Sequence, residues 1–184
     1  MRRRAFLIGS SALLAACGSP APQREIEGEL LSTWEPTPHP VVRKMLEMAQ
    51  LRPGELLYDL GSGDGRIVIA AAEEFRAQAL GFEIDRDLAH LSQKAIRSKR
   101  LSRLARVVPE DLMSADFSKP DVVACYLTPE GLAKVTPKLE AEMRPGTRLV
   151  AYKFPIPGWT PVQTETMKDP DPNIPLHEIF LYHR

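Results

Sequence analysis

Three closely spaced glycines follow an apolar segment and precede a second one, with an acidic residue on either side of the first two. The apolar Leu56–Leu60 is typical of a buried strand, and after Gly61, Gly63 and Gly65 the spacing of apolar residues predicts a helix. Glycine lets the backbone turn sharply and approach a ligand closely, and the free N–H groups of a first helical turn favour an anionic group. The sequence therefore predicts a ligand-binding loop at the carboxyl end of a parallel strand.

The spacing of the glycines limits the class of ligand. A dinucleotide fingerprint requires G-x-G-x-x-G, but here Gly65 comes one residue early and Arg66 occupies the expected place. A pyrophosphate would also lie beside Asp64, and a contact between like charges at ~4 Å costs about 1 to 4 kcal/mol. A P-loop is excluded because no Gly-Lys-Ser/Thr follows the first glycine at the required distance. Nicotinamide dinucleotides and nucleotide phosphates are therefore disfavoured.

S-adenosylmethionine fits the charges of the loop better. Its ammonium can bind Asp59, its carboxylate can bind the helix N–H groups, and its sulfonium tolerates Asp64 nearby. Glu83 ends the next strand, where a carboxylate can accept two hydrogen bonds from ribose hydroxyls, each worth ~1.5 to 3 kcal/mol. Asp111 and Leu112 follow the third strand, where they can bind an adenine. We therefore predict S-adenosylmethionine as the cofactor, held by Asp59, Gly61, Ser62, Gly63, Asp64, Glu83, Asp111 and Leu112.

Each acidic residue also has an ordinary structural interpretation. Asp64 could be a turn residue, Glu83 a solvated strand end and Asp111 a helix cap. Their joint occurrence after three successive strands favours the ligand-binding interpretation. Asp85 and Glu110 are interpreted as solvated neighbours of the site.

The elements that must position these residues alternate along the chain. We predict a helix around residues 41–49, ended by Pro53 and Gly54, and a C-terminal pair of short strands with no helix between them. Alternating strands and helices are typical of a parallel sheet with helices on both faces, whereas the last two strands should pair antiparallel. The expected fold is α/β, a Rossmann-like doubly wound, mostly parallel seven-stranded sheet with a C-terminal antiparallel pair. The predicted strands are 56–60, 79–84, 105–108, 122–127, 148–154, 161–166 and 178–183, and the other helices are 66–75, 87–99 and 129–143.

Length and charge limit the classes of function. The 184 residues, 43% of them hydrophobic, are enough for one domain with a sizeable core. The 24 basic and 24 acidic residues leave no net positive charge of the kind that nucleic-acid binders use against phosphates. We predict one domain over residues 34–184, expected to be a monomer that binds no nucleic acid and no metal.

The first residues have the composition of a targeting segment. Arg2-Arg3-Arg4 precedes an apolar run, residues 5–16, that is shorter than the ~20 residues that a membrane-spanning helix needs. The sequence Leu14-Ala15-Ala16-Cys17 resembles a bacterial lipobox, and Arg3-Arg4-Ala5-Phe6-Leu7 resembles a twin-arginine signal. We predict a signal peptide at 1–17 with lipidation at Cys17, and a flexible tether at 18–33. The expected protein is an exported lipoprotein on the periplasmic side of a membrane, attached only through its lipid, or a cytoplasmic protein if the signal is not used.

Residues 36–160 resemble the class I S-adenosylmethionine-dependent methyltransferases, most specifically in Asp59 to Gly65 and Glu83. More narrowly, residues 59–68 and the segment Phe154-Pro155-Ile156-Pro157-Gly158-Trp159-Thr160-Pro161 are similar to the mitochondrial protein-lysine methyltransferases that modify an ATP synthase c subunit or an adenine nucleotide translocator. The resemblance implies that a protein lysine accepts the methyl group and that Pro36-Thr37-Pro38 covers the methionine end of the cofactor. It also implies that the cofactor is held by Asp59, Gly61, Gly63, Glu83 and Asp111.

The acceptor is less clearly indicated than the cofactor. Residues 126–129, Tyr-Leu-Thr-Pro, do not spell the Asn/Asp-Pro-Pro-Tyr/Phe of enzymes that methylate planar amines, so adenine and glutamine acceptors are disfavoured. Tyr126, Lys153 and Trp159 are candidate pocket groups, and no residue is assigned as catalytic. Two alternatives stay open: a small-molecule methyltransferase, and a non-catalytic exported lipoprotein that keeps the fold as a binding module. The intact loop argues against the second, and the little sequence outside the core, too short for a lid, favours a protruding side chain over a small molecule.

Overall fold

The computed structural model describes residues 35–169, 171, 173 and 175–184. The predicted signal peptide at 1–17, its lipidation site Cys17 and the tether at 18–33 lie outside the described residues. None of the helices in the described part of the chain has the length and apolarity that a membrane span requires.

Within the described residues, seven strands form one sheet in the order β3-β2-β1-β4-β5-β7-β6. β1 lies between β2 and β4, and the chain passes from β1 outward to β3 on one side before it returns to β4 on the other. The strand order therefore reverses beside β1, which is the place where open α/β sheets bind their ligands. The five parallel strands are β1 (Leu56–Leu60), β2 (Gln78–Phe82), β3 (Ala105–Val108), β4 (Val122–Cys125) and β5 (Arg148–Tyr152).

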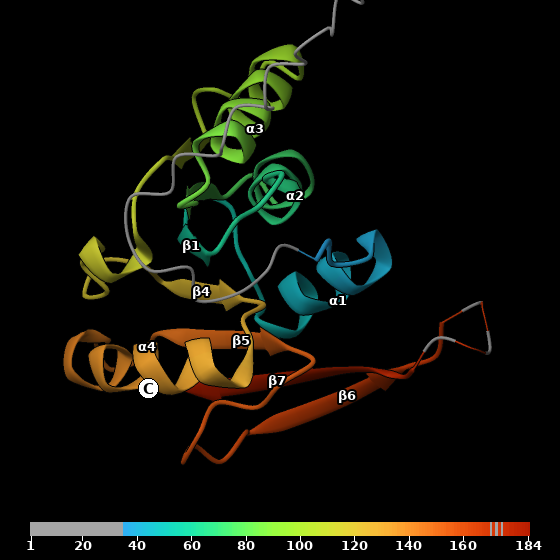
Figure 1. The fold of residues 1–184 in the computed structure, drawn as a ribbon, viewed down its shortest axis with the longest axis vertical. Coiled ribbons are helices and arrows are strands. Elements are labelled where there is room, and N and C mark those ends of the chain that lie inside the picture. The colour runs from blue at the N-terminus through green and yellow to red at the C-terminus, as the bar shows by residue number, and fades with distance from the viewer. Residues whose placement is uncertain (1–34, 170, 172, 174) are drawn as a thin grey trace, which may run out of the picture.

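Helices cover both faces of the sheet (Figure 1). Because side chains alternate along a strand, β1 contributes Leu57 to the apolar core on one face, and Tyr58 and Leu60 to the core on the other. The predicted doubly wound α/β fold is confirmed. The first core lies under α1 (His39–Met48), α2 (Arg66–Glu74) and α3 (Arg86–Ser98), and the second under α4 (Pro129–Glu142) and the short 3-10 helix η1 (Leu112–Ser114).

The C-terminal strands pair antiparallel, as the sequence predicted. β7 (His177–His183) pairs with both β5 and β6 (Gln163–Met167), so the last strand of the chain lies between two earlier ones. β7 is buried over most of its length, whereas β6 forms the edge of the sheet and is largely exposed. The predicted bounds, 161–166 and 178–183, lie within two residues of the observed ones, and the end at residue 183 agrees.

Three parallel strands end earlier than the sequence predicted. Leu60 is the last residue of β1 to pair with its neighbours, because the chain turns away at Gly61, and the ladders on both sides end there. The last two residues predicted for each of these three strands therefore lie in loops at the carboxyl edge of the sheet. They include Glu83, Tyr126 and Lys153.

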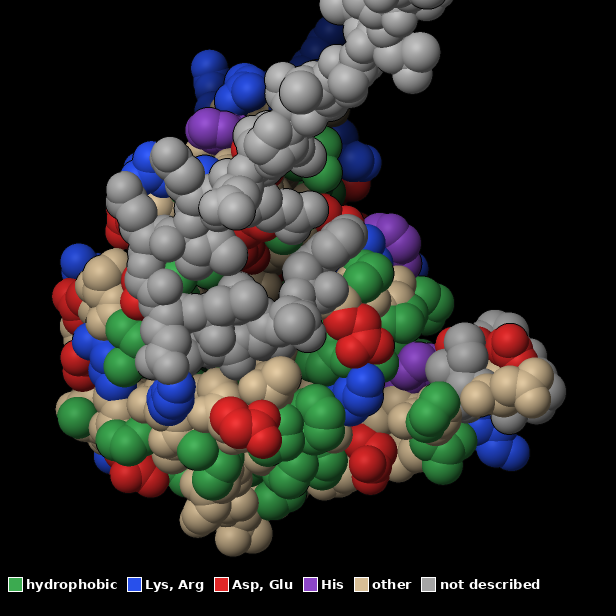
Figure 2. All heavy atoms as spheres, in the orientation of Figure 1, with side chains coloured by type: hydrophobic (Ala, Val, Ile, Leu, Met, Phe, Trp, Pro, Cys, Tyr) green, Lys and Arg blue, Asp and Glu red, His purple; other side chains and the backbone are tan. Residues whose placement is uncertain are grey.

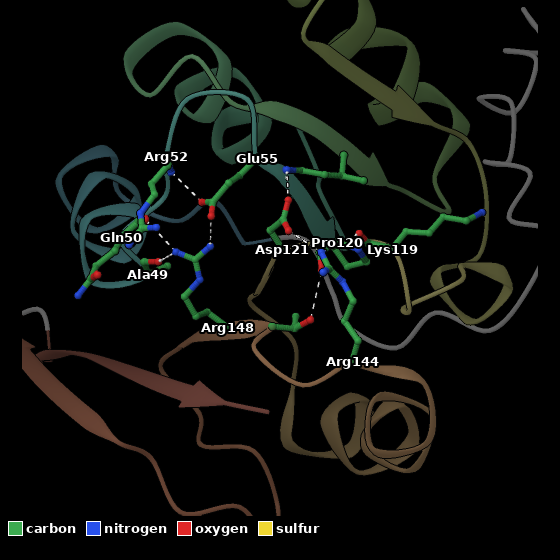
Figure 3. A network of polar contacts seen from close by, with 11 residues as sticks. Ala49, Gln50, Arg52, Glu55, Lys119, Pro120, Asp121, Arg144 and Arg148 are labelled. Atoms are coloured by element: carbon green, nitrogen blue, oxygen red, sulfur yellow. Dashed lines mark hydrogen bonds and ion pairs between the residues drawn. The ribbon is translucent and has the colours of Figure 1, made fainter.

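A polar network closes the opposite edge, where the strands begin (Figure 3). Arg148, the first residue of β5, donates to the carbonyl oxygens of Ala49 and Gln50 at 2.7 and 2.8 Å. Its guanidinium also pairs with Glu55, just before β1, at 2.6 Å. One side chain therefore ties the end of α1 to the starts of β1 and β5. The figure also labels Arg52, Lys119, Pro120, Asp121 and Arg144.

Candidate functional site

The glycine loop leaves β1 at the centre of the sheet and turns back toward β2. Gly61 and Gly65 adopt left-handed φ angles of +75° and +78°, which residues with a side chain rarely adopt. The N–H groups of Gly61 and Ser62 both donate to the carbonyl oxygen of Phe82, each at 3.0 Å. α2 begins at Arg66, so the loop connects a parallel strand to a helix as predicted.

Gly81 lets the loop pack directly on β2. A Cβ at this position would lie 2.6 Å from both the Cβ and the Oγ of Ser62, and 3.0 Å from a methyl group of Val68. Real atoms do not approach so closely, so only glycine fits here without a shift of the loop. The sequence pattern gave no signal for Gly81, because its role depends on a contact with a loop from another part of the chain.

Glu83 is buried beside the loop and binds it. Its Oε2 accepts the Gly63 N–H at 2.6 Å, and its Oε1 accepts the Asp85 N–H at 2.9 Å. Burial raises the pKa of Glu83, while the two backbone N–H groups oppose that rise. The structure thus brings together two predicted site residues and shows that Glu83 also holds the loop in place.

The interpretation of Asp85 as a solvated neighbour is wrong. Asp85 is only 6% exposed, and its carboxylate accepts from the N–H groups of Asp87 and Leu88 as the N-cap of α3. α3 begins at Arg86, one residue before the predicted start, which gives Asp85 the capping position. A short acidic side chain is favoured there because it satisfies N–H groups of the first turn. Glu110, by contrast, is exposed as expected.

Two buried oxygens of the loop region lack a partner. Asp59 is 2% exposed, and its Oδ2 has no hydrogen-bond partner among the described residues, nor does the Oγ of Ser62. Burial, followed by the charges of Glu83 and Asp64, raises the pKa of Asp59 well above its ordinary value. A buried carboxyl oxygen without a hydrogen-bond partner is costly, and a bound cationic amino group would satisfy it. These atoms therefore fit the ammonium end of S-adenosylmethionine.

Replacing Asp59 with asparagine should stabilise the ligand-free protein at neutral pH. A folded-state pKa above the ordinary 3.8 means that Asp59 costs stability as the pH rises through and above that value, and asparagine does not ionise. We expect the Asp59→Asn protein to unfold at a higher temperature than the unmodified protein at about pH 8. The difference between the two unfolding temperatures should become smaller toward about pH 4. Thermal unfolding across this range, with and without S-adenosylhomocysteine, measures both effects. The ligand should raise the unfolding temperature of the unmodified protein more than that of the variant, and an equal rise in both would contradict the assignment of Asp59.

Asp64 is paired rather than free. It forms an ion pair with Arg66 at 2.6 Å. Burial works against ionisation, but the hydrogen bonds and charge of Arg66 hold the pKa of Asp64 below its ordinary value. Arg66 also donates to the carbonyl oxygen of Thr37 at 2.7 Å, which fastens residues 35–38, here called the strap, to the glycine loop. The segment expected to cover the methionine end of the cofactor thus lies against that loop, through an arginine that the sequence pattern had not singled out.

Asp111 and Leu112 lie at the carboxyl end of β3. The Oδ1 of Asp111 accepts the Met113 N–H at 2.9 Å, so Asp111 caps η1, which is the structural interpretation left open from the sequence. Leu112 is buried in the core under α4. The cap fixes the backbone of this loop, and contact of either residue with the cofactor stays a prediction.

The three candidate pocket groups do not form one cluster. The Tyr126 hydroxyl donates to Glu35 at 2.6 Å, and Lys153 donates to the Tyr126 oxygen at 3.0 Å. Trp159 packs on the other face of the sheet, where its Nε1 donates to Glu140 of α4 at 2.7 Å. Tyr126 and Lys153 therefore share the carboxyl edge with the loop, and Trp159 does not.

Comparisons with known proteins agree with this geometry. Residues 59–163 match the family described as the ANTKMT methyltransferase domain. A protein-lysine N-methyltransferase of Saccharolobus islandicus (strain REY15A) is 37% identical over 148 residues, 80% of this chain and 90% of that protein. The adenine nucleotide translocase lysine N-methyltransferase of Mus musculus is 35% identical, over 66% of this chain and 52% of that protein, so the chain spans about half of this longer relative. The crystal structure of an RNA methyltransferase from Salinibacter ruber in complex with S-adenosyl-L-homocysteine superposes with a TM-score of 0.74 and 37% identity, over 81% of this chain and 93% of that one.

Proposed function

The chain belongs to the ANTKMT methyltransferase family, and we propose that it transfers the methyl group of S-adenosylmethionine to the ε-amino group of a lysine side chain in a protein. The main support for lysine as the acceptor is the 37% identity to the protein-lysine N-methyltransferase of Saccharolobus islandicus, which extends over 90% of that relative. The small-molecule methyltransferase and the non-catalytic binding module, the alternatives from the sequence, have no such support.

The cofactor is held, in this proposal, by the residues predicted from the sequence. When bound, it supplies an electrophilic methyl group on a positively charged sulfur. Asp59 accepts hydrogen bonds from the ammonium, and Glu83 accepts from the ribose hydroxyls through the lone pairs that the loop leaves unused. The support is the Oδ2 of Asp59, which has no partner in the described part of the chain, and the position of Glu83 against Gly63.

The acceptor nitrogen must lose a proton before it can attack, and neither Tyr126 nor Cys125 is suited to accept it. Burial, and then the hydrogen bond and charge of Glu35, raise the pKa of Tyr126, which keeps its proton. Burial also raises the pKa of the Cys125 thiol to about 12, so this side chain packs in the core and is not a nucleophile. In this proposal the proton passes to solvent before the attack, and the protein contributes alignment and desolvation of the reacting groups.

RNA is the rival acceptor because the Salinibacter ruber relative is named an RNA methyltransferase. Binding of RNA needs clustered basic side chains. This chain has equal numbers of basic and acidic residues, so it has no net positive charge. On the face shown in Figure 2, Lys and Arg gather near α3 at the top and are interspersed with Asp and Glu over the rest. Glu35, at the carboxyl edge, would also repel a phosphate. Lysine is therefore the favoured acceptor.

We further propose that residues 1–17 act as a lipoprotein signal with Cys17 as the lipidation site. The support is the order of basic, apolar and small residues in the sequence. A membrane fraction is accordingly the first source of acceptor to test.

The experiment is incubation of the protein with methyl-labelled S-adenosylmethionine and three acceptor pools: membrane proteins, soluble proteins and total RNA. We expect label in protein, and mass spectrometry of the labelled peptides should place it on lysine. Glu83→Ala, which removes a cofactor contact, is the negative control. Label in RNA, lipid or small molecules, or on protein residues other than lysine, would overturn the lysine proposal.

A further inference from the structure

The ammonium of Lys153 is surrounded by groups that favour a cation. Its Nζ lies 3.0 Å from the Tyr126 oxygen, 3.3 and 3.4 Å from the two carboxylate oxygens of Glu35, and 5.6 and 5.7 Å from the ring centroids of Tyr126 and Phe154. Carboxylate oxygens, a phenol oxygen and two ring faces each attract an alkylammonium. Glu35, Tyr126 and Phe154 are called the ammonium cage below.

The protonation states of the cage suit this role. The hydrogen bond from Tyr126, opposed in part by burial and assisted by Lys153, lowers the pKa of Glu35, which is therefore ionised. Burial and Glu35 raise the pKa of Tyr126, so its hydroxyl stays protonated and donates a hydrogen bond to Glu35. The phenol oxygen is then left as an acceptor for an ammonium.

The cage lies beside the cofactor loop. Ala124 pairs with Asp59 across β1 and β4, and Tyr126 is two residues further along, so alternation places Tyr126 and Asp59 on the same face. From the other side, Glu35 is two residues from Thr37, a separation of at most ~7 Å between Cα atoms. The carbonyl of Thr37 is bound by Arg66 at the end of the loop. The strap, which contains Glu35, and β4, which leads to Tyr126, thus place the cage beside the glycine loop.

The cage is also open to solvent. The side chains of Lys153 and Glu35 are 41% and 62% exposed, so another lysine can reach the cage without unfolding any element. Lys153 itself adopts a left-handed φ of +69°, held by the hydrogen bond from its N–H to the carbonyl oxygen of Glu178 at 2.8 Å. Its backbone is therefore fixed, and only its side chain has to move.

We propose that the ammonium cage binds the side chain of the acceptor lysine, and that Lys153 occupies it as an internal competitor until the acceptor displaces it. The contacts described above are sufficient to infer that the cage binds a primary alkylammonium. Its role toward a lysine acceptor rests on the proposed function. Glu35 binds and selects the charged acceptor, and it is not the base that removes the proton.

The test is titration with n-butylammonium, which reproduces the end of a lysine side chain, monitored by NMR of the backbone amides of Tyr126 and of the residue at position 153. Lys153→Asn removes the competitor with a residue that tolerates positive φ. We expect it to bind n-butylammonium at least tenfold more tightly than the unmodified protein, and the added change Glu35→Gln to reverse the gain. Lys119→Met, which removes another exposed lysine, is the matched control and should leave affinity unchanged. Equal affinity of the unmodified and Lys153→Asn proteins would overturn the proposal.

A second measurement separates the cage from a purely structural role of the strap. We expect Glu35→Gln to leave the affinity for S-adenosylhomocysteine within twofold of normal and to raise KM for the lysine acceptor more than it lowers kcat. A loss of S-adenosylhomocysteine affinity as large as the loss of n-butylammonium affinity would show that Glu35 only positions the strap, and would reject the proposal. Because the titration needs no turnover, it can succeed even if the labelling experiment finds an acceptor other than lysine.

Discussion

Replacing Glu83 with alanine is expected to weaken the binding of S-adenosylhomocysteine at least tenfold. Glu83 has two tasks: it accepts the N–H groups of Gly63 and Asp85, and it is proposed to accept from the ribose hydroxyls. Hydrogen bonds to a charged group are worth ~1.5 to 3 kcal/mol each, so loss of one ribose bond alone accounts for about a tenfold weakening. The loop also loses the bond that holds Gly63. Calorimetry of the protein with S-adenosylhomocysteine measures the change.

Two further variants make this measurement specific. Glu83→Gln keeps the size of the side chain but offers only one oxygen acceptor. Its affinity for S-adenosylhomocysteine should therefore lie between those of the Glu83→Ala protein and the unmodified protein. Glu110→Ala removes an exposed acid near the same edge and should leave affinity unchanged. If the Glu83→Ala protein remains folded and binds S-adenosylhomocysteine as tightly as the unmodified protein, Glu83 is not a cofactor-binding residue.

Replacing Arg148 with methionine is expected to lower the free energy of unfolding by about 2 to 4 kcal/mol. Methionine retains the apolar stem but leaves the carbonyl oxygens of Ala49 and Gln50 without the guanidinium donor, and leaves the carboxylate of Glu55 with only the Arg52 N–H (Figure 3). The side chains of Arg148 and Glu55 are only 14% and 21% exposed, so water replaces those bonds poorly. Urea unfolding followed by circular dichroism measures the difference.

The exposed ion pair between Arg43 and Glu47 provides the comparison. The side chain of Arg43 is 67% exposed, so Arg43→Met should change the free energy of unfolding by less than about 1 kcal/mol. Affinity for S-adenosylhomocysteine should be normal in folded Arg148→Met protein, because the network lies at the opposite edge from the loop. A loss of stability no larger than that of Arg43→Met would show that the network contributes little.

The sequence predicted the fold well where local patterns determine structure. The alternation of apolar segments with helical spacing identified the seven strands and the main helices, because burial on both faces requires these patterns. It did not identify the ends of β2, β4 and β5, since a strand ends where its neighbours stop pairing. The position of β7 between β5 and β6 also depends on pairing between distant segments, which no local pattern records.

The same division applies to the candidate site. The loop glycines and Glu83 lie together as predicted, because the carboxyl ends of neighbouring parallel strands meet at one edge. Contacts between distant segments could not be predicted: Gly81 under Ser62, Arg66 on Thr37, and Glu35 on Tyr126. Asp85 was misassigned because the start of α3 was placed one residue late.

β7 follows β6 in the chain but separates it from β5. On the ribosome, β6 therefore emerges before the strand with which it pairs, and the edge of β5 stays open until residues 177–183 have been added. An open edge can pair with another nascent chain. The parallel strands and the glycine loop come earlier and can fold during synthesis, so insertion of β7 between β5 and β6 is the step that removes this open edge from contact with other chains.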